Sequence, residues 1–477
     1  MKSIKRLPQV DGELGWYLTA PNVDRKIGKA LKGEQTADIA IIGAGFTGLA
    51  AAERLQELYP DKKIAVVEAL DVGQGTSGRN AGFIIDLPHN VDAKENSEAE
   101  DFQLYALNQF AIARLFERMQ KYSINCLWHQ AGKYMVARED KNIAGLDAFE
   151  HTLKKRDFAY QRLKRGELAQ KLGTEYYQEG IFTPGNVLMN PAALVRGLAL
   201  GLQKHLDVYT HSPVIGIEYG DVHQIHTVGG VLRAKTIVQT MSSFSEETGL
   251  VKNKIAPVFT YGSLTDPLPE DLLQKHFQDI EPWGLTSAHP AGTTVRFTPD
   301  KRILVRNILE FNPRQASTAE VRNQAWQQHR KSFVARFPFL EHIDFQYTWG
   351  GLLAVTMNHN SVFEKLADNV YGICGCNGVG VAKGTYLGYY MAEMMHGNQS
   401  KELAFIQTTS HANRIPPEPF RSIGARYQIN REQSAAGMDI WVYRPLKTAS
   451  IHKALKRFCL SKELIVLVFD EGKKMVT

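Results

Sequence analysis

A glycine-rich turn between two short apolar segments constrains this chain more than any other feature of its sequence. Residues 38–43 (DIAIIG) predict a buried parallel strand, and residues 49–59 (LAAAERLQELY) predict the helix that follows it. Residues 62–68 (KKIAVVE) predict a second buried strand, which completes a βαβ unit of about 30 residues. Because such crossovers are right-handed, we expect the two strands side by side in a sheet with the helix on one face.

The turn itself, residues 43–48 (GAGFTG), is a GxGxxG motif. Gly43 permits the tight turn, Gly45 lets the backbone approach a pyrophosphate, and Gly48 lets the helix pack closely on the strand. The helix N-terminus supplies free N–H groups for phosphate oxygens. Glu68, at the end of the second strand, can accept hydrogen bonds from a ribose. In this context the motif predicts a dinucleotide site, and a plain glycine turn in an ordinary α/β protein is the alternative.

Two further glycine-rich segments indicate which dinucleotide binds. Residues 73–83 (GQGTSGRNAGF) follow the second strand. An extended FAD needs such additional backbone near its pyrophosphate and ring, whereas a nicotinamide cofactor does not. The segment 73–83 therefore favours FAD. Residues 374–382 (CGCNGVGVA) follow another predicted strand and open a helix.

With these segments in this order, the chain resembles the FAD-dependent D-amino-acid oxidase (DAO) superfamily over roughly residues 10–440. The segment GTSGRNAG is similar to the family's GASGRNGG-like segment. The segment CGCNGVG is similar to its GFSGHG turn, with Asn377 and Val379 in place of the commoner Ser and His. Residues 16–20, 349–358 and 414–426 resemble the branch that contains gamma-glutamylputrescine oxidoreductase.

The resemblance implies which residues contact the cofactor and how it is held. Arg79 and Asn80 stand where some relatives carry the histidine that tethers a flavin, so the FAD is expected to be noncovalent. The expected FAD-binding residues lie in the three glycine-rich segments and at a few separate positions. They are Gly43, Gly45, Phe46, Thr47, Gly48, Glu68, Ala69, Gly75, Thr76, Ser77, Arg79, Asn80, Ala81, Gly82, Val214, Gly350, Asn377, Gly378, Val379 and Gly380.

The resemblance also implies the fold class. We expect an α/β (α+β) protein with a Rossmann-like FAD-binding lobe and a second lobe, built on a mainly antiparallel sheet, of the D-amino-acid oxidase/glycine oxidase type. The expected segments are an N-terminal arm (1–36), a discontinuous FAD-binding domain (37–90, 185–245 and 355–398), a substrate domain (91–184 and 246–354), a C-terminal wrap (399–443) and a tail extension (444–477).

The substrate site is less well marked. Members of this family pass a hydride from a substrate carbon to the flavin, which needs a neutral amine and close stacking more than a strong acid or base, and no catalytic residue can be named from the sequence. In amino-acid-specific relatives an arginine after the W-x-G segment binds the substrate carboxylate in a bidentate clamp. This chain has residues 352–354 (LLA) there instead.

Four residues are candidates for the substrate pocket. Arg306 stands where the family has glycine, and its side chain can reach flavin or substrate or else form a surface ion pair. Arg302 matches a family arginine with a structural role. Trp349 can form an apolar wall or simply pack, and Tyr261 is a weaker candidate.

The expected activity is therefore that of an FAD-dependent oxidoreductase that removes a hydride from a C–N bond of an amine or amino acid, giving an imine that hydrolyses. The missing clamp favours a polyamine-derived or N-substituted amine. An L- or D-amino-acid oxidase or dehydrogenase whose clamp has moved to Arg306 is the alternative. A flavoprotein that modifies or matures a partner protein is an alternative of another class. The electron acceptor is O2 or another oxidant.

Charge and composition exclude other classes of function. The chain carries 56 Lys and Arg against 50 Asp and Glu, a net charge of +6. This excess lies at the two ends, in residues 1–36 and 444–477, so a nucleic-acid groove is not expected. Cys374 and Cys376 form a C-x-C without nearby ligands, so no metal site is expected.

The expected location is the cytoplasm. Four scattered cysteines do not form a disulfide framework. No segment has the apolar core of a signal peptide or the length of a membrane span. The tail, 444–477, joins basic residues to an apolar run and is expected to contact a subunit or an anionic membrane surface, or to dock as an ordinary segment.

Overall fold

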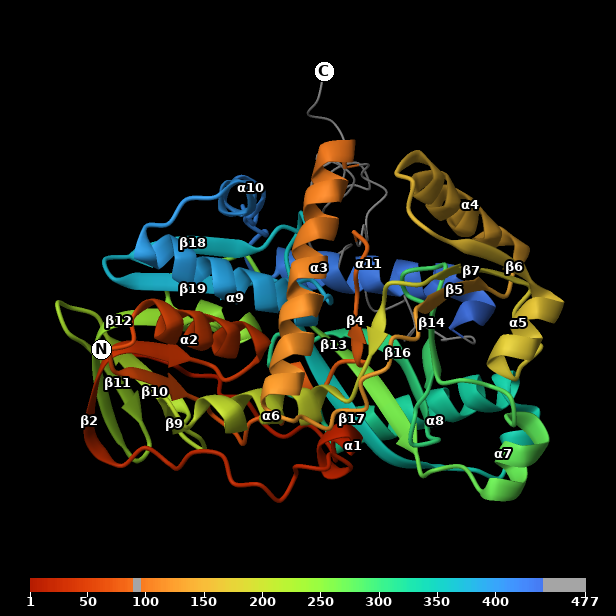
Figure 1. Ribbon diagram of the computed structural model, residues 1–477, viewed down its shortest axis with the longest axis horizontal. Coiled ribbons are helices and arrows are strands. Elements are labelled where there is room, and N and C mark those ends of the chain that lie inside the picture. The colour runs from red at the N-terminus through yellow and green to blue at the C-terminus, as the bar shows by residue number, and fades with distance from the viewer. Residues whose placement is uncertain (89–95, 441–477) are drawn as a thin grey trace.

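Two large β-sheets organise the computed structural model of the chain, which describes residues 1–88 and 96–440 (Figure 1). The first sheet has the strand order β1-β10-β11-β12-β2-β3-β9, and β19 and then β18 extend it from β12. Its strands are β1 (Lys2–Ser3), β2 (Gly33–Ile42), β3 (Ile64–Val67), β9 (Asp207–Tyr209), β10 (Val214–Glu218), β11 (His223–Thr227), β12 (Gly230–Gln239), β18 (Val362–Ala367) and β19 (Val370–Cys374).

The predicted βαβ unit forms the centre of this sheet. β2 pairs in parallel with β3 on one side and with β12 on the other. The helix between β2 and β3 is α2 (Phe46–Leu58), which packs on α9 (Gly380–His396). Gly384 and Gly388 permit this packing, because a Cβ on Gly388 would lie 2.2 Å from the carbonyl oxygen of Thr47. α3 (Glu98–Lys121) and α6 (Pro191–Leu202) join the same hydrophobic core.

The second sheet has the order β17-β13-β16-β15-β14-β5-β7-β6 and is antiparallel except for the β14–β5 pair. Its strands are β5 (Lys133–Ala137), β6 (Gln161–Lys164), β7 (Glu179–Thr183), β13 (Ala256–Thr265), β14 (Trp283–Ser287), β15 (Thr294–Phe297), β16 (Ile303–Phe311) and β17 (Phe345–Val355). One face packs on α8 (Ala319–Arg336) through an aromatic core that includes Phe297, Phe333 and Phe337.

Shorter elements complete the molecule. The helices are α1 (Gly15–Leu18), α4 (Asp140–Lys155), α5 (Arg165–Leu172), α7 (Glu270–His276), α10 (Lys401–Thr409) and α11 (Phe420–Ala436). The 3-10 turns are η1 (Thr76–Gly78), η2 (Ser242–Thr248), η3 (Pro338–Leu340) and η4 (Gly437–Asp439), and β4 (Phe83–Ile84) pairs with β8 (Val187–Leu188). Among the helices that the structure describes, none is long and apolar enough to cross a membrane.

The α/β fold class expected from the sequence is confirmed, and the two sheets draw on different chain segments. Strands from 37–90, 185–245 and 355–398 lie in the first sheet, apart from β4 and β8, whereas strands from 91–184 and 246–354 lie in the second. Two features differ from the sequence interpretation. The expected substrate domain on a mainly antiparallel sheet also contains the 18-residue helix α8, for which the sequence showed no pattern, and the N-terminal arm supplies β1, which pairs with β10. The tail, 444–477, lies outside the described residues.

Candidate active site

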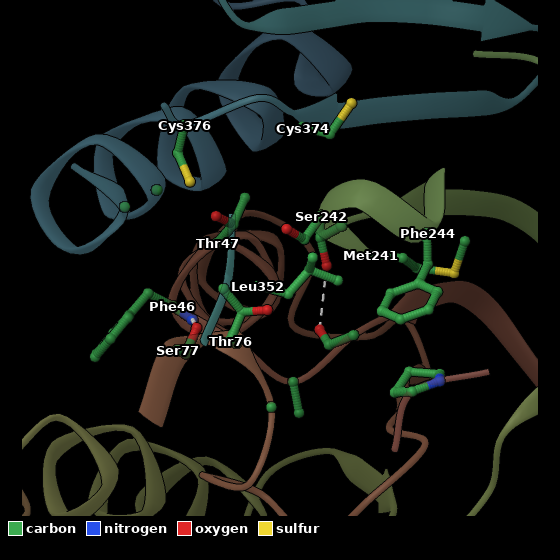
Figure 2. A pocket seen from close by; sticks show the side chains of 18 of the residues that line it. Phe46, Thr47, Thr76, Ser77, Met241, Ser242, Phe244, Leu352, Cys374 and Cys376 are labelled. Atoms are coloured by element: carbon green, nitrogen blue, oxygen red, sulfur yellow. Dashed lines mark hydrogen bonds between the residues drawn. The ribbon is translucent and has the colours of Figure 1, made fainter. Parts of the chain in front are cut away.

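The first cavity lies at the carboxyl ends of β2 and β3, where the three glycine-rich segments meet. Figure 2 shows Phe46 and Thr47 from α2, Thr76 and Ser77 from η1, and Cys376 before α9 around the same space. Three helical N-termini border it, and none is capped by the side chain of the residue that precedes it: Gly45 precedes α2, Gly75 precedes η1 and Val379 precedes α9. Backbone N–H groups at such termini favour anions.

The glycines around the cavity show how closely a ligand can approach the protein backbone. A Cβ on Gly45 would lie 2.6 Å from the Ser77 hydroxyl oxygen, which itself accepts a hydrogen bond from Phe46 N at 3.1 Å. Gly75 and Gly378 face open space, since a Cβ on either would meet no atom within 4 Å. Both glycines line the cavity. These glycines therefore leave backbone open to the cavity, as the pyrophosphate of an extended dinucleotide requires.

Glu68 occupies the position expected for a ribose ligand. Its two carboxylate oxygens accept hydrogen bonds from Ala44 N at 2.8 Å and Leu70 N at 3.1 Å. These bonds fix the carboxylate beside the end of β3, where Ala69 and Val214 also line the cavity. Burial raises the pKa of the Glu68 carboxyl. A ribose diol placed there would donate hydrogen bonds to a carboxylate that is already oriented.

Arg79 stands where this cavity meets a second one, and it contributes to the walls of both. The side chain is buried and donates hydrogen bonds to three backbone carbonyls: Nε to Gln74 at 2.6 Å, and Nη1 to Asp11 at 3.0 Å and Gly350 at 2.9 Å. Desolvation lowers the pKa of the guanidinium to about 10. Nη2 has no hydrogen-bond partner among the described residues, so it can donate to a bound ligand.

Fourteen of the expected FAD-binding residues line the first cavity, and Ala81 and Val379 line the second. The glycines 48 and 82 line neither. A Cβ on Gly48 would lie 1.9 Å from the carbonyl oxygen of Gly43, so Gly48 serves the contact between helix and strand. A Cβ on Gly82 would lie 1.9 Å from Nη1 of Arg296, which anchors the loop by donating to the carbonyls of Ala81 and Met189.

Gly350 and Asn377 also lie outside the cavity walls. Gly350 faces Phe259 on the opposite side of β17, so its neighbour Gly351 lines the cavity instead. Asn377, with φ of 54°, turns its side chain inward. Its amide donates to the carbonyls of His359 and Gly375, both at 2.8 Å, and its oxygen accepts from Thr356 N. Asn377 therefore shapes the turn before α9 and presents no side-chain hydrogen bond to the cavity.

Sequence reasoning missed part of this cavity. The segment after β12 contributes Met241, Ser242 and Phe244, and the N-terminal arm contributes residues including Ile4 and Leu7. Neither segment carries a motif. The arm reaches the cavity because β1 pairs with β10, and the segment 241–244 reaches it because β12 runs parallel to β2 and ends beside the glycine turn. Only the position of β12 next to β2 could have indicated the second segment.

The second cavity, of about 550 Å³, lies over the face of the second sheet that α8 does not cover. The two cavities meet where they share lining residues, which are Arg79, Asn80, Thr260, Leu353, Gly378 and Gly380. A ligand ring seated at this junction is in contact with both spaces. The second cavity is therefore the candidate substrate site.

A row of residues crosses the sheet beneath the second cavity. Gly262 pairs with Arg306, Arg306 with Thr294, and Thr286 with Met135, and all of them line the cavity. Arg306 is the charged member of the row and is partly buried. Desolvation lowers the pKa of its guanidinium to about 10. In the described part of the chain, no hydrogen bond or ion pair satisfies this group, so it is available to an anion.

The charges around the cavity are mostly positive. Arg79, Lys133, Lys155, Arg156 and Arg306 contribute to the wall. The one described carboxylate on it, that of Asp101, is paired with Arg156 at 2.9 Å. This environment favours anionic ligands and disfavours polycations.

The other three pocket candidates lie outside the cavity walls. Trp349 donates a hydrogen bond from Nε1 to the backbone carbonyl of Arg79 at 3.1 Å, so it holds the backbone at Arg79 in place. Arg302 donates to Asp300 at 3.0 Å and to the carbonyl of Thr265 at 2.9 Å, which is a structural role.

Tyr261 is fully buried on the opposite side of β13 from the cavity. Its hydroxyl donates to the Glu310 carboxylate at 2.5 Å and accepts from Ser317 at 3.2 Å. Burial and the adjacent carboxylate raise the pKa of the phenol. The neighbouring Thr260 and Gly262 line the cavity instead.

Replacing Tyr261 by phenylalanine tests this placement. Tyr261→Phe removes the hydroxyl and leaves the Glu310 carboxylate without that donor, so we expect about 1–2 kcal/mol less stability. Because the ring does not touch the cavity, kcat/KM should change less than twofold. Urea unfolding and steady-state kinetics measure the two quantities. A large loss of kcat/KM with unchanged stability would place Tyr261 in the substrate site after all.

No metal site forms in the described ranges, where no group of three or more His, Cys, Asp or Glu side chains is arranged to hold an ion. Cys374 and Cys376 are free thiols, and burial raises the pKa of both.

The fold and the first cavity are those of a dinucleotide-binding protein of the α/β class. Residues 38–394 match the DAO family, described as FAD dependent oxidoreductase. The chain therefore belongs to the DAO family, and its cofactor is FAD. The uncapped helical N-termini, the open glycines and the partner-free Nη2 of Arg79 all fit this cofactor.

Relatives in sequence and structure agree with this assignment. The chain is 26% identical over 411 residues to a probable oxidoreductase OrdL of Haemophilus influenzae, covering 82% of this chain and 91% of that protein. It is 24% identical over 412 residues to gamma-glutamylputrescine oxidoreductase of Escherichia coli, covering 83% and 93%.

Two solved structures show the same fold at low sequence identity. Glycine oxidase from Geobacillus kaustophilus has a TM-score of 0.64 and 17% identity, covering 77% of this chain and 96% of that one. L-amino acid deaminase from Proteus vulgaris, solved without its specific insertion, has a TM-score of 0.62 and 17% identity, covering 80% and 96%.

Proposed function

We propose that the protein oxidises a C–N bond of an amino acid or N-substituted amino acid, and that Arg306 binds the substrate carboxylate. The observation that carries the proposal is a guanidinium without a protein partner in the wall of the second cavity, one strand from the junction with the FAD cavity. A planar guanidinium fits a carboxylate in a bidentate arrangement. FAD, when bound, supplies the acceptor for the hydride.

The chain's own residues orient the substrate in this proposal. Arg306 holds the carboxylate on β16, and Thr260 on the adjacent strand β13 lies at the junction of the cavities. A C–N bond next to the carboxylate would then face the junction. Such positioning, with water excluded, supplies much of the barrier reduction in a hydride transfer. The electron acceptor in the second half-reaction is oxygen or another oxidant.

The polyamine-derived substrate favoured from the sequence is less well supported. That preference rested on the missing arginine after the W-x-G segment, and Arg306 fills this gap from another strand. A polyamine carries several positive charges at neutral pH, and the cations of this cavity would repel it. An N-substituted amino acid keeps both the substituted amine and the carboxylate. A cavity of about 550 Å³ suits a small molecule better than a protein partner.

The direct test is anaerobic mixing of the purified holoenzyme with matched pairs of compounds while the flavin absorbance is followed. Alanine against ethylamine, and N-methylalanine against N-methylethylamine, differ in the carboxylate alone. We expect the acids to bleach the flavin at least about 10-fold faster than the amines at equal concentration, because one charge-assisted contact is worth about 1.5–3 kcal/mol. Equal rates, or bleaching by putrescine alone, would contradict the proposal.

A further inference from the structure

A second cation lies at the far end of the substrate cavity. Lys133 begins β5, is 4% exposed and contributes to the cavity wall. Over the ranges 1–88 and 96–440, its amine has no hydrogen-bond or ion-pair partner. The established reaction class gives this lysine no role. Burying an amine without a partner is costly, so a specific reason for its presence is expected.

Strand pairing places Lys133 relative to Arg306. The order β16-β15-β14-β5 separates them by three strand spacings, about 14 Å. Met135 lies in the row that contains Arg306, and Lys133 shares its face because alternate residues of a strand point the same way. Tyr134 and Val136 pack into the aromatic core on the opposite face. The two cations therefore lie on one sheet face, toward opposite ends of one cavity.

The carboxyl group of Asp86, which lies near Lys133, forms no ion pair with the lysine amine. Asp86 is buried close by, but the described residues show no ion pair between them, and Oδ1 of Asp86 has no hydrogen-bond partner. Burial lowers the pKa of the Lys133 amine and raises that of the Asp86 carboxyl, and the attraction between the two charges opposes both shifts without offsetting them. An incoming anion would stabilise the charged amine, so the free end of Lys133 suits an anionic ligand group.

Sheet order separates Lys133 from the strand that reaches the junction of the cavities. Thr260 of β13, which lines both cavities, lies four strand spacings from β5, about 19 Å. A lysine side chain does not span that length, so Lys133 does not reach a substrate group held beside Thr260. The group that it binds is therefore remote from that part of the substrate.

We propose that the substrate carries a second acidic group, remote from the C–N bond that is oxidised, and that Lys133 binds this group while Arg306 binds the first. The inference rests on the proposed function, because it takes the Arg306 carboxylate contact as given. The substrate class is then an amino acid or N-substituted amino acid with an additional acid on an extended chain.

The test measures binding of unreactive acids to the holoenzyme by perturbation of the visible flavin spectrum. The probes are malonate, succinate, glutarate and adipate, each compared with the monocarboxylate of equal chain length. We expect the best dicarboxylate to bind at least 10-fold more tightly than its monocarboxylate. In Lys133→Met this preference should fall below twofold, and Lys133→Arg should restore part of it. Monocarboxylate affinity should stay the same in both variants.

A double variant covers the case in which Lys133→Met fails to fold around the buried Asp86. Lys133→Met/Asp86→Asn removes both charges, and its folding is checked by circular dichroism and flavin content. If the dicarboxylate preference survives in this variant, Lys133 serves only to balance Asp86 and the proposal is overturned. Loss of the preference in a folded double variant supports it. A wild-type enzyme without any dicarboxylate preference overturns it before any variant is made.

The Arg306→Met variant separates this inference from the proposed function. If that variant binds monocarboxylates as tightly as the wild type, the proposed carboxylate site fails, and both ideas fall. If it loses monocarboxylate binding while Lys133→Met keeps the dicarboxylate preference, only the second acidic group is overturned.

Discussion

Gly45→Val is expected to lower the affinity of the protein for FAD about 1,000-fold. Gly45 precedes α2, and a Cβ there would already lie 2.6 Å from the Ser77 hydroxyl oxygen. The two methyl groups of valine would fill the space in front of the helix N-terminus, where phosphate oxygens bind. Losing two charge-assisted hydrogen bonds, at about 2 kcal/mol each, gives a change of this size. Fluorescence titration of the apoprotein with FAD measures the affinity.

Gly166→Val provides the matched control. Gly166 lies near the start of α5, and a Cβ there would meet no atom within 4 Å. This variant should bind FAD within twofold of the wild type. Circular dichroism should show that both variants are folded. An unchanged affinity in a folded Gly45→Val variant would mean that the pyrophosphate does not lie at α2, contrary to the interpretation of the glycine motif.

The glycine-rich turns that border the first cavity could be predicted from the sequence because local chemistry fixes them. A GxGxxG turn between two buried strands needs glycine for steric reasons, and those reasons hold whatever surrounds the turn. The same logic predicts the turn before α9, which lines the first cavity through Gly378 and Gly380. It does not predict the direction of the Asn377 side chain, which a left-handed backbone and three hydrogen bonds turn inward. A motif gives the path of the backbone but not the direction of every side chain.

The substrate site was harder to predict because it depends on which face of each strand lines the cavity. Alternation along β13 puts Thr260 and Gly262 on the cavity face and Tyr261 on the other, and nothing in the sequence shows which face meets the cavity. Tyr261 consequently points to Glu310. The helix α8 escaped notice for a related reason: its buried positions include His329, Ser332 and Arg336, which break the apolar pattern of an amphipathic helix.

Lys133 shows what no local pattern could indicate. In the sequence GKYMVARE it is an ordinary lysine beside a short run of apolar residues. It becomes a candidate ligand because β5 pairs in parallel with β14, which brings residue 133 onto the face that also carries Arg306. These two residues are 173 positions apart in the chain. The order of the strands in the sheet therefore decides which charged side chains line the cavity.

Arg306→Met is expected to lower kcat/KM for an amino-acid substrate about 100-fold, mainly through a higher KM. Methionine keeps much of the side-chain volume but removes the bidentate contact with the carboxylate, worth about 2–3 kcal/mol. Because that contact forms equally in the ground state and the transition state, the loss falls on binding. Arg306→Lys keeps the charge without the planar geometry, so it should recover part of the affinity. Steady-state kinetics separates KM from kcat.

Arg302→Met is the control for this prediction. It removes an arginine four residues earlier, next to the start of β16, whose guanidinium is already paired with Asp300 at 3.0 Å and lies outside the cavity wall. Its kcat/KM should change less than about threefold, although lost hydrogen bonds to Asp300 and Thr265 should lower stability by about 1–2 kcal/mol. If the two variants lose kcat/KM equally, Arg306 acts through the stability of β16. A selective effect on KM at Arg306 would instead locate the substrate carboxylate on this strand, one strand from the flavin junction.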